Sequence, residues 1–151
     1  MEGKEDENEN EKIDLTLLSR INKVFDSIPA QLAKENKKFT YSLLEKKGRS
    51  GNYETAIQWL YEAGIINICY NLSNISLPLE GNKIKDVFKI YMQDSGLFVA
   101  MLEEGSAWHI LNGDFGIYKG AIYENIIADA FSKKSKPLYY YHKDSGLEID
   151  F

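Results

Sequence analysis

The sequence GIYKGAIYENIIADAF at residues 116–131 is followed closely by KPLYYYHKDSGLEIDF at residues 136–151. In the first segment apolar residues recur at helical spacing, which predicts a helix over residues 121–131. Its apolar stripe is formed by Ile122, Tyr123, Ile126, Ile127, Ala130 and Phe131. Glu124 lies at the border of this stripe, so we expect its carboxylate to face a neighbouring sheet.

The second segment predicts a hairpin of two strands, at residues 138–141 and 147–151, around the turn sequence KDSG. Successive side chains of a strand point to opposite faces, so Glu148 and Asp150 share one face. If the preceding helix packs beside that face, Glu124 and Asp150 converge on one position.

Two converging carboxylates offer oxygen ligands to a hard divalent cation such as Mg²⁺. Glu124 and Asp150 are therefore the candidate metal ligands and the candidate catalytic residues. The alternative is structural, because isolated acids at a helix edge and on a strand face are commonly solvated. The sequence pattern leaves both interpretations open.

The earlier part of the chain has the order of a winged helix, with three helical segments followed by a two-stranded ribbon. We assign residues 13–92 to this module. Its expected elements are a helix at 14–28 that ends before Pro29, helices at 41–47 and 53–63, a strand at 65–70 and a returning strand from 87. Beyond it, a short helix is expected at 97–103.

Such a module can insert the second helix of its helix-turn-helix motif into the major groove of DNA, with basic residues near the phosphates. Lys46, Lys47 and Arg49 are the candidate nucleic-acid contacts. However, the expected recognition helix carries Glu54 and Glu62 and no basic residue. The alternative is that the module serves as a structural connector.

The composition of the chain indicates a globular protein without disulfides or membrane spans. The chain has 151 residues, 44% of them hydrophobic and 13% aromatic, which is enough for a packed core. Residues 1–12 begin with an acidic run without aromatic residues, and we expect them to be disordered. The single cysteine, Cys69, excludes an internal disulfide and is expected to be buried. No apolar run is long enough to span a membrane and there is no signal-peptide pattern, so we expect a cytoplasmic protein.

Three segments resemble a known family: KIYMQDSGL at residues 89–97, the G-x-x-x-E-N pattern at 120–125, and SGLEIDF at 145–151. They look like the C-terminal region of bacterial and archaeal AAA+ ATPases that end in a domain of unknown function of the DUF4143 type. The similarity covers nearly everything after residue 12.

The resemblance implies a parent protein with an N-terminal P-loop ATPase, a winged-helix connector and a C-terminal nuclease-like domain of the PD-(D/E)XK type. In this chain the latter would be a truncated domain at residues 93–151, with Glu124 as the helix acid and Asp150 as the strand acid. ATP would bind to the parent only. The acid and lysine expected just after Asp150 are absent from this sequence, so we expect no hydrolysis by this chain.

We therefore expect an α+β chain that acts as connector and nuclease-like accessory domain of an AAA+ ATPase. Its expected partners are the ATPase domain and a second copy of the chain. Three other functions remain open: a winged-helix DNA-binding protein, an active Mg²⁺-dependent nuclease, and a protein-interaction module. The last would use the aromatic residues Trp59, Trp108 and 139–141.

Overall fold

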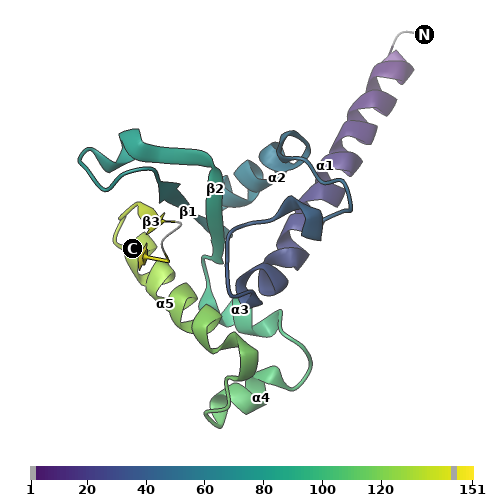
Figure 1. Cartoon of the computed structure of the whole chain (residues 1–151). Coiled ribbons are helices and arrows are strands. Elements are labelled where there is room, and N and C mark those ends of the chain that lie inside the picture. The colour runs from purple at the N-terminus through teal and green to yellow at the C-terminus, as the bar shows by residue number, and fades with distance from the viewer. Residues whose placement is uncertain (1–2, 144–145) are drawn as a thin grey trace.

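The computed structural model describes residues 3–143 and 146–151. It has the expected α+β class (Figure 1). The helices are α1 (Gly3–Ala33), α2 (Ser50–Glu62), α3 (Ser95–Ala100), α4 (Ser106–Leu111) and α5 (Lys119–Lys133), with short 3₁₀ helices η1 (Tyr41–Leu43), η2 (Leu79–Asn82) and η3 (Gly116–Tyr118). The strands are β1 (Ile66–Leu72), β2 (Lys83–Met92), β3 (Leu138–His142) and β4 (Glu148–Asp150).

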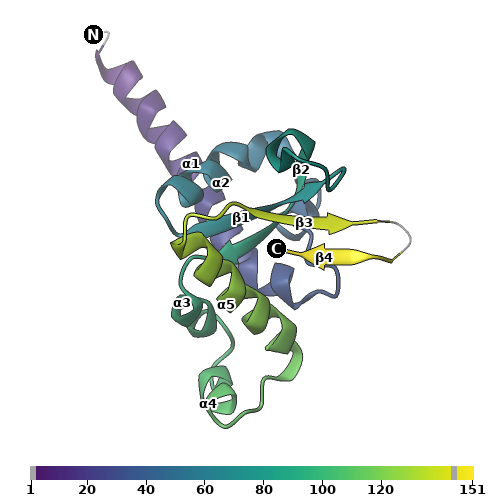
Figure 2. The ribbon, with the colours of Figure 1, turned by 90° about the vertical axis from the view of Figure 1, so that its left-hand side faces the viewer.

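The four strands form one mixed sheet in the order β2-β1-β3-β4. Strand β1 is antiparallel to β2 and parallel to β3, and β4 returns antiparallel to β3 (Figure 2). The expected C-terminal hairpin is therefore present. Residues 144 and 145 of its turn lie outside the described residues.

This sheet joins the two expected modules. Cys69 of β1 is paired with Leu138 of β3, and a single cluster of buried residues extends from Ile21 to Tyr140. The ribbon with β2 uses only one edge of β1, so the other edge is free to pair with β3. The expected boundary between residues 92 and 93 therefore falls within a shared sheet and a shared core.

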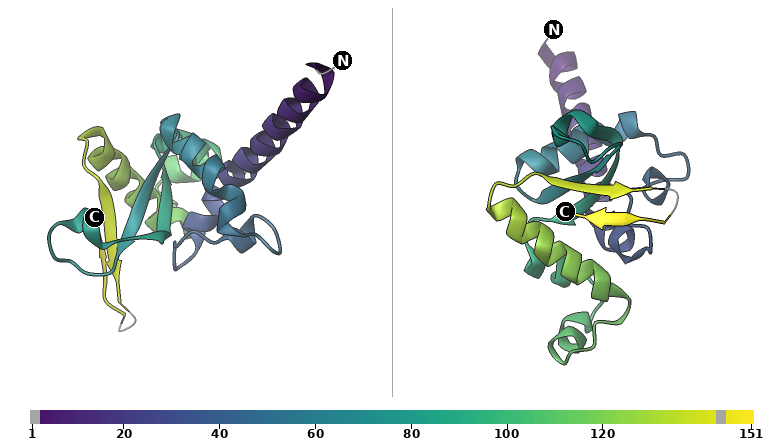
Figure 3. Two further views of the ribbon diagram at one scale, coloured as in Figure 1. Left: turned by 90° about the horizontal axis from the view of Figure 1, so that it is seen from above. Right: turned by 60° about the vertical axis from the view of Figure 1, so that its left-hand side comes forward.

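Helices cover both faces of the sheet. Helices α1 and α2 lie on one side, and α5 lies on the other (Figure 3). On the first side Phe39 stacks on Phe88 of β2, with ring centroids 5.6 Å apart. The backbone N–H of Phe39 also donates to the Phe88 carbonyl, at 2.8 Å, which covers part of the outer edge of β2. Residues 88–92 of β2 are consequently all buried.

Helix α1 differs from the expectation at both ends. It continues through Pro29 to Ala33, because Gln31 and Leu32 beyond the proline are both 1% exposed and their burial offsets the lost backbone hydrogen bond. It also begins at Gly3, where a disordered lead-in was expected, and projects away from the rest of the chain (Figure 1). Glutamate and lysine are good helix formers, and extending an existing helix requires no new nucleation.

Other helices also begin or end at residues that differ from the expected ones. The helix expected at 41–47 is reduced to the 3₁₀ turn η1, and α2 begins three residues before Tyr53. The short helix expected at 97–103 is α3, which begins at Ser95 because the Asp94 side chain accepts a hydrogen bond from the Leu97 N–H at 2.8 Å. Helix α4 was not expected.

Helix α5 has the expected position but a different buried face. Its buried residues are Ala121, Ile122, Asn125 and Ala128. Most of the predicted apolar stripe faces outward instead: Tyr123, Ile126, Ile127 and Phe131 are each 40–48% exposed. The small residues Ala121 and Ala128 allow the helix to approach the sheet closely, and the buried Asn125 bonds to it.

Candidate functional site

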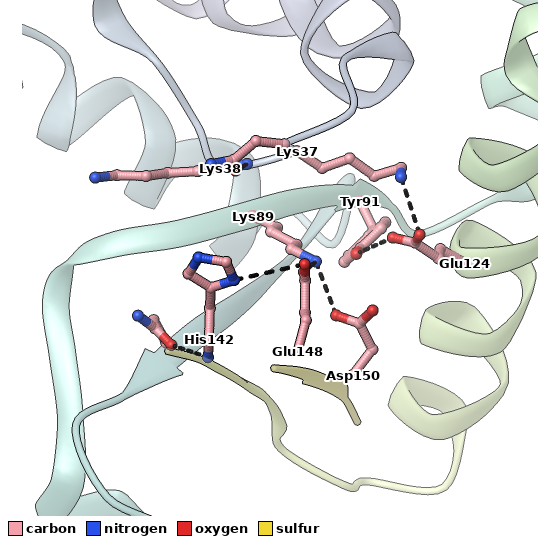
Figure 4. Close-up of polar contacts among 10 residues, drawn as sticks. Lys37, Lys38, Lys89, Tyr91, Glu124, His142, Glu148 and Asp150 are labelled. Atoms are coloured by element: carbon pink, nitrogen blue, oxygen red, sulfur yellow. Dashed lines mark hydrogen bonds and ion pairs between the residues drawn. The ribbon is translucent and has the colours of Figure 1, made fainter. Parts of the chain in front are cut away.

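Lys89 is the only charged residue in the buried core of the part of the chain that the structure describes. It belongs to the run VFKIYM in β2, both faces of which are covered, so the residue is only 2% exposed. Its ammonium donates to Glu148 Oε1 at 2.6 Å and to Asp150 Oδ1 at 2.8 Å (Figure 4). It also lies 4.6 Å from the centre of the Tyr140 ring. The two acids of β4 thus satisfy a buried positive charge.

Glu124 lies beside these groups (Figure 4). The hydroxyl of Tyr91, two residues after Lys89 on the same strand face, donates to Glu124 Oε2 at 2.8 Å. Lys37, in the segment after α1, approaches Glu124 Oε1 to 3.0 Å. We call Lys37, Lys89, Glu124, Glu148 and Asp150 the acid–lysine cluster. It draws on α5, β2, β4 and the segment after α1.

The pKa shifts in the cluster follow from these contacts. Burial opposes the charged form of Lys89, but hydrogen bonds from its ammonium to Asp150 and Glu148 outweigh it and raise the pKa. Burial likewise opposes the charged form of Glu148, and the Lys89 hydrogen bond outweighs it and lowers the pKa of that carboxyl. Burial, followed by the negative charge of Glu124, raises the pKa of Tyr91. Tyr91 is therefore a neutral hydrogen-bond donor.

These directions predict a bell-shaped pH dependence for the stabilisation by the cluster. The contribution of Glu148 is present above its ordinary pKa of 4.5 and lost as the pH falls through the lower folded value. The contribution of Lys89 is present below its ordinary pKa of 10.5 and lost as the pH rises through the higher folded value. Urea unfolding of the chain and of its Glu148→Gln, Asp150→Asn variant should therefore differ most between these limits. An equal difference at strongly acidic and neutral pH would contradict this prediction.

Asn125 fixes the position of Glu124 against the sheet. Asn125 is fully buried, and its Oδ1 accepts from the Met92 N–H at 2.7 Å. Its Nδ2 donates to the Met92 carbonyl and to Ser95 Oγ, both at 3.2 Å. These bonds hold α5 at the end of β2, next to Tyr91.

The structure brings the predicted acids together, in the arrangement that the alternation of strand side chains suggests. Glu124 faces the sheet, and Asp150 shares a face with Glu148. Lys46, Lys47 and Arg49 lie elsewhere, exposed in the segment before α2. The sequence interpretation missed Lys37, Lys89, Tyr91 and Asn125. Lys89 gave a usable signal, because a single lysine inside an apolar strand needs a buried partner.

The arrangement favours ion pairing over metal binding. Among the side chains that the structure describes, at residues 15–143 and 146–151, no group of three or more His, Cys, Asp or Glu is arranged to hold a metal ion. An oxygen each of Glu148 and Asp150 accepts from Lys89, and both oxygens of Glu124 are engaged by Tyr91 and Lys37. Carboxylate oxygens are also the ligands that Mg²⁺ prefers, so a bound ion would compete with Lys89, Lys37 and Tyr91 for them. These contacts compete with the binding of a metal ion at Glu124 and Asp150.

The fold and the cluster define an α+β chain whose polar centre is a buried lysine surrounded by acids. The chain belongs to a family described as a domain of unknown function (DUF8612), which matches residues 9–107. The match covers the whole of the expected module at residues 13–92 and ends within the expected module at 93–151, before Glu124, Glu148 and Asp150. No curated protein and no solved structure matches the chain. None of the described helices has the length and apolar character needed to cross a membrane.

Proposed function

We propose that this chain is the connector and nuclease-like accessory region of a cytoplasmic AAA+ ATPase, and that it does not hydrolyse nucleic acid by itself. One observation carries the proposal: the three segments that resemble such ATPases meet in the acid–lysine cluster. KIYMQDSGL supplies Lys89 and Tyr91, the G-x-x-x-E-N segment supplies Glu124 and Asn125, and SGLEIDF supplies Glu148 and Asp150. The resemblance implies that a helix acid and a strand acid share one site, and Glu124 and Asp150 lie in the same cluster. ATP would bind to the parent only.

The absence of hydrolysis follows from the charges in the cluster. The Lys89 ammonium lies between the carboxylates of Glu148 and Asp150, and its positive charge opposes the binding of a divalent cation beside them. A buried ammonium with two hydrogen-bonded acids is not easily displaced, because its removal would leave those acids unpaired. The cluster therefore stabilises the packing of α5 and β4 against β2 and has no catalytic role.

A nuclease assay tests this proposal. Single-stranded and duplex DNA incubated with the chain and Mg²⁺ or Mn²⁺ should remain intact, at the level of the Glu124→Ala and Asp150→Ala variants. Lys89→Met serves as a further comparison, because it frees the oxygens of Glu148 and Asp150. Metal-dependent cleavage by the unmodified chain that disappears in both acid variants would show an active nuclease and overturn the proposal.

The outer face of α5 is a candidate contact surface for a partner protein. Tyr123, Ile126, Ile127 and Phe131 form an exposed apolar surface, and such a surface commonly marks a protein–protein contact. The ATPase domain or a second copy of the chain would cover it, and light scattering distinguishes the two. Of the aromatic residues expected in an interaction surface, Trp59 and Trp108 are exposed by 47% and 65%. Tyr140, in contrast, is in the core at 4% exposure.

DNA binding is the second candidate function. Lys46, Lys47 and Arg49 are exposed, and none of them has an ion pair within the described residues. They precede α2, where a helix-turn-helix protein approaches the phosphates. The exposed face of α2 nevertheless carries Glu54 and Glu62.

A mobility-shift assay at low salt checks this candidate. If the module binds duplex DNA, changing Lys46, Lys47 and Arg49 to glutamate should weaken binding at least about tenfold, because phosphate contacts are lost. A matched variant with Lys119, Lys134 and Lys143 changed to glutamate has the same net charge and should bind normally. Equal weakening in both variants, or no shift of the unmodified chain, would eliminate this binding site.

A further inference from the structure

Strand β4 forms an open edge of the sheet. It is last in the strand order β2-β1-β3-β4, and its three residues are all exposed (Figure 2). The Phe151 N–H donates to the Tyr139 carbonyl at 3.0 Å. Because the backbone groups of an antiparallel strand face a given neighbour at every second residue, those of Glu148 and Asp150 point away from β3. They can therefore pair with an added strand.

The other edge of the sheet, at β2, is partly covered. The Phe39 N–H already bonds to the Phe88 carbonyl, and the first residues of the strand include Lys83 and Lys85. Lysines on an edge strand discourage pairing with another chain. Of the two edges of the described sheet, β4 is therefore the one that can accommodate a further strand.

The two faces of β4 offer different chemistry. On one face, the side chains of Glu148 and Asp150 remain 40% and 30% exposed beside Lys89. The acid–lysine cluster has three carboxylates against two ammonium groups, so it carries an excess of one negative charge. On the other face, Leu147 and Ile149 are 52% and 47% exposed.

These faces determine which strand fits the edge. A residue of an added strand that lies opposite Asp150 shares the face of the acids, and opposite charges in such a cross-strand pair are favourable. The next residue lies opposite Ile149, on the apolar face. An extended segment in which basic and apolar residues alternate therefore matches both faces.

A second copy of β4 does not match. Antiparallel pairing of two β4 strands about Ile149 would place Glu148 of one chain opposite Asp150 of the other, and like charges directly opposite each other are destabilising. The β2 edge of a second copy is no better partner, because its Phe88 carbonyl is already bonded to Phe39.

We propose that the open edge of β4 binds an extended segment of a partner protein by strand addition, with a basic residue of that segment opposite Asp150 and an apolar residue opposite Ile149. Main-chain bonds to Glu148 and Asp150 hold the segment, and the alternation of its side chains selects it. This site does not rest on the proposed function, because it requires neither an ATPase domain nor a nuclease-like role.

NMR titration of the isotope-labelled chain with the capped peptide Thr-Lys-Val-Lys-Val-Lys-Thr tests the proposal. The peptide should give saturable shifts at residues 147–151 and slow the hydrogen exchange of the Glu148 and Asp150 amides, which would then donate to it. The same peptide with glutamate in place of lysine should bind about tenfold more weakly, because its charges oppose the acids. The lysine peptide N-methylated at its lysines should not bind, because the backbone edge that faces β4 is blocked.

Three outcomes would overturn the proposal. The first is no saturable binding of the lysine peptide at millimolar concentration, and the second is equal binding of the glutamate or N-methylated peptide. The third is self-association of the chain alone that Ile149→Lys abolishes, since light scattering would then assign the edge to a second copy.

Variants of the chain locate the contact. Ile149→Lys should weaken binding of the lysine peptide about fivefold, because an apolar cross-strand contact is lost. Leu18→Lys makes the same change of charge at a similarly exposed position on α1 and should leave binding unchanged. Asp150→Asn should lower the preference for the lysine peptide over the glutamate peptide about threefold, because one surface charge pair is lost. Binding and preference that are unaffected by the changes at Ile149 and Asp150 would place the peptide elsewhere and contradict the proposal.

Discussion

Replacing Glu148 with Gln and Asp150 with Asn together should lower the free energy of unfolding by about 3 kcal/mol, because a buried ammonium then loses both of its counter-charges. Lys89 is 2% exposed and cannot reach water without moving β2. The side chains of Glu148 and Asp150 are 40% and 30% exposed, so each acid can be hydrated when unpaired. Lys89→Met should therefore be less destabilising, at about 1 kcal/mol. Urea unfolding at neutral pH measures both effects.

The combined variant of all three residues isolates the interaction. Since Met at position 89 removes the buried charge, the triple variant should recover most of the stability lost in the double acid variant. The exposed pair Lys23–Glu45, at 3.5 Å, provides the control. Glu45→Gln should change the free energy of unfolding by at most about 0.5 kcal/mol. A Lys89→Met variant that is less stable than the double acid variant would contradict the buried-charge argument.

Asn125→Ala should also lower the free energy of unfolding by about 3 kcal/mol. The change leaves the buried N–H and carbonyl of Met92 without their Asn125 partners and opens a small cavity, and the higher helix propensity of alanine offsets only part of this. Asn125→Leu keeps the branched shape, with larger methyl groups in place of the amide atoms, and should still cost at least about 2 kcal/mol, because the polar groups of Met92 remain unsatisfied. Thermal or urea unfolding measures both variants.

Asn112 is the matched control for this position. Its Nδ2 donates to the Trp108 carbonyl at 2.8 Å on the exposed surface of α4. Water replaces that bond, so Asn112→Ala should cost no more than about 0.5 kcal/mol. If Asn125→Leu were as stable as the original chain, the contact between α5 and β2 would depend on shape alone and not on these hydrogen bonds.

Local patterns in the sequence predicted the local features of the site. Alternation along β4 placed Glu148 and Asp150 on one face, and helical spacing placed Glu124 at the border of its stripe. Both are relations between residues a few positions apart, which backbone geometry determines directly. The same geometry could not say which side of α5 is buried. Most of the apolar stripe faces outward, and a polar residue, Asn125, faces the sheet because its amide bonds to the end of β2.

The sequence by itself determined the α+β class, the positions of most helices and strands, and the face that Glu148 and Asp150 share. Only the tertiary structure decided that β1 pairs with β3 across two expected modules, that α1 continues through Pro29, and that Lys37 and Lys89 neutralise the acids. Periodicity records which face of an element is apolar, whereas strand pairing and ion pairing depend on which distant segments pack together. Lys89 is buried on a strand whose two faces are covered, so its charge needs carboxylate partners. The packing of β4 places Glu148 and Asp150 beside it.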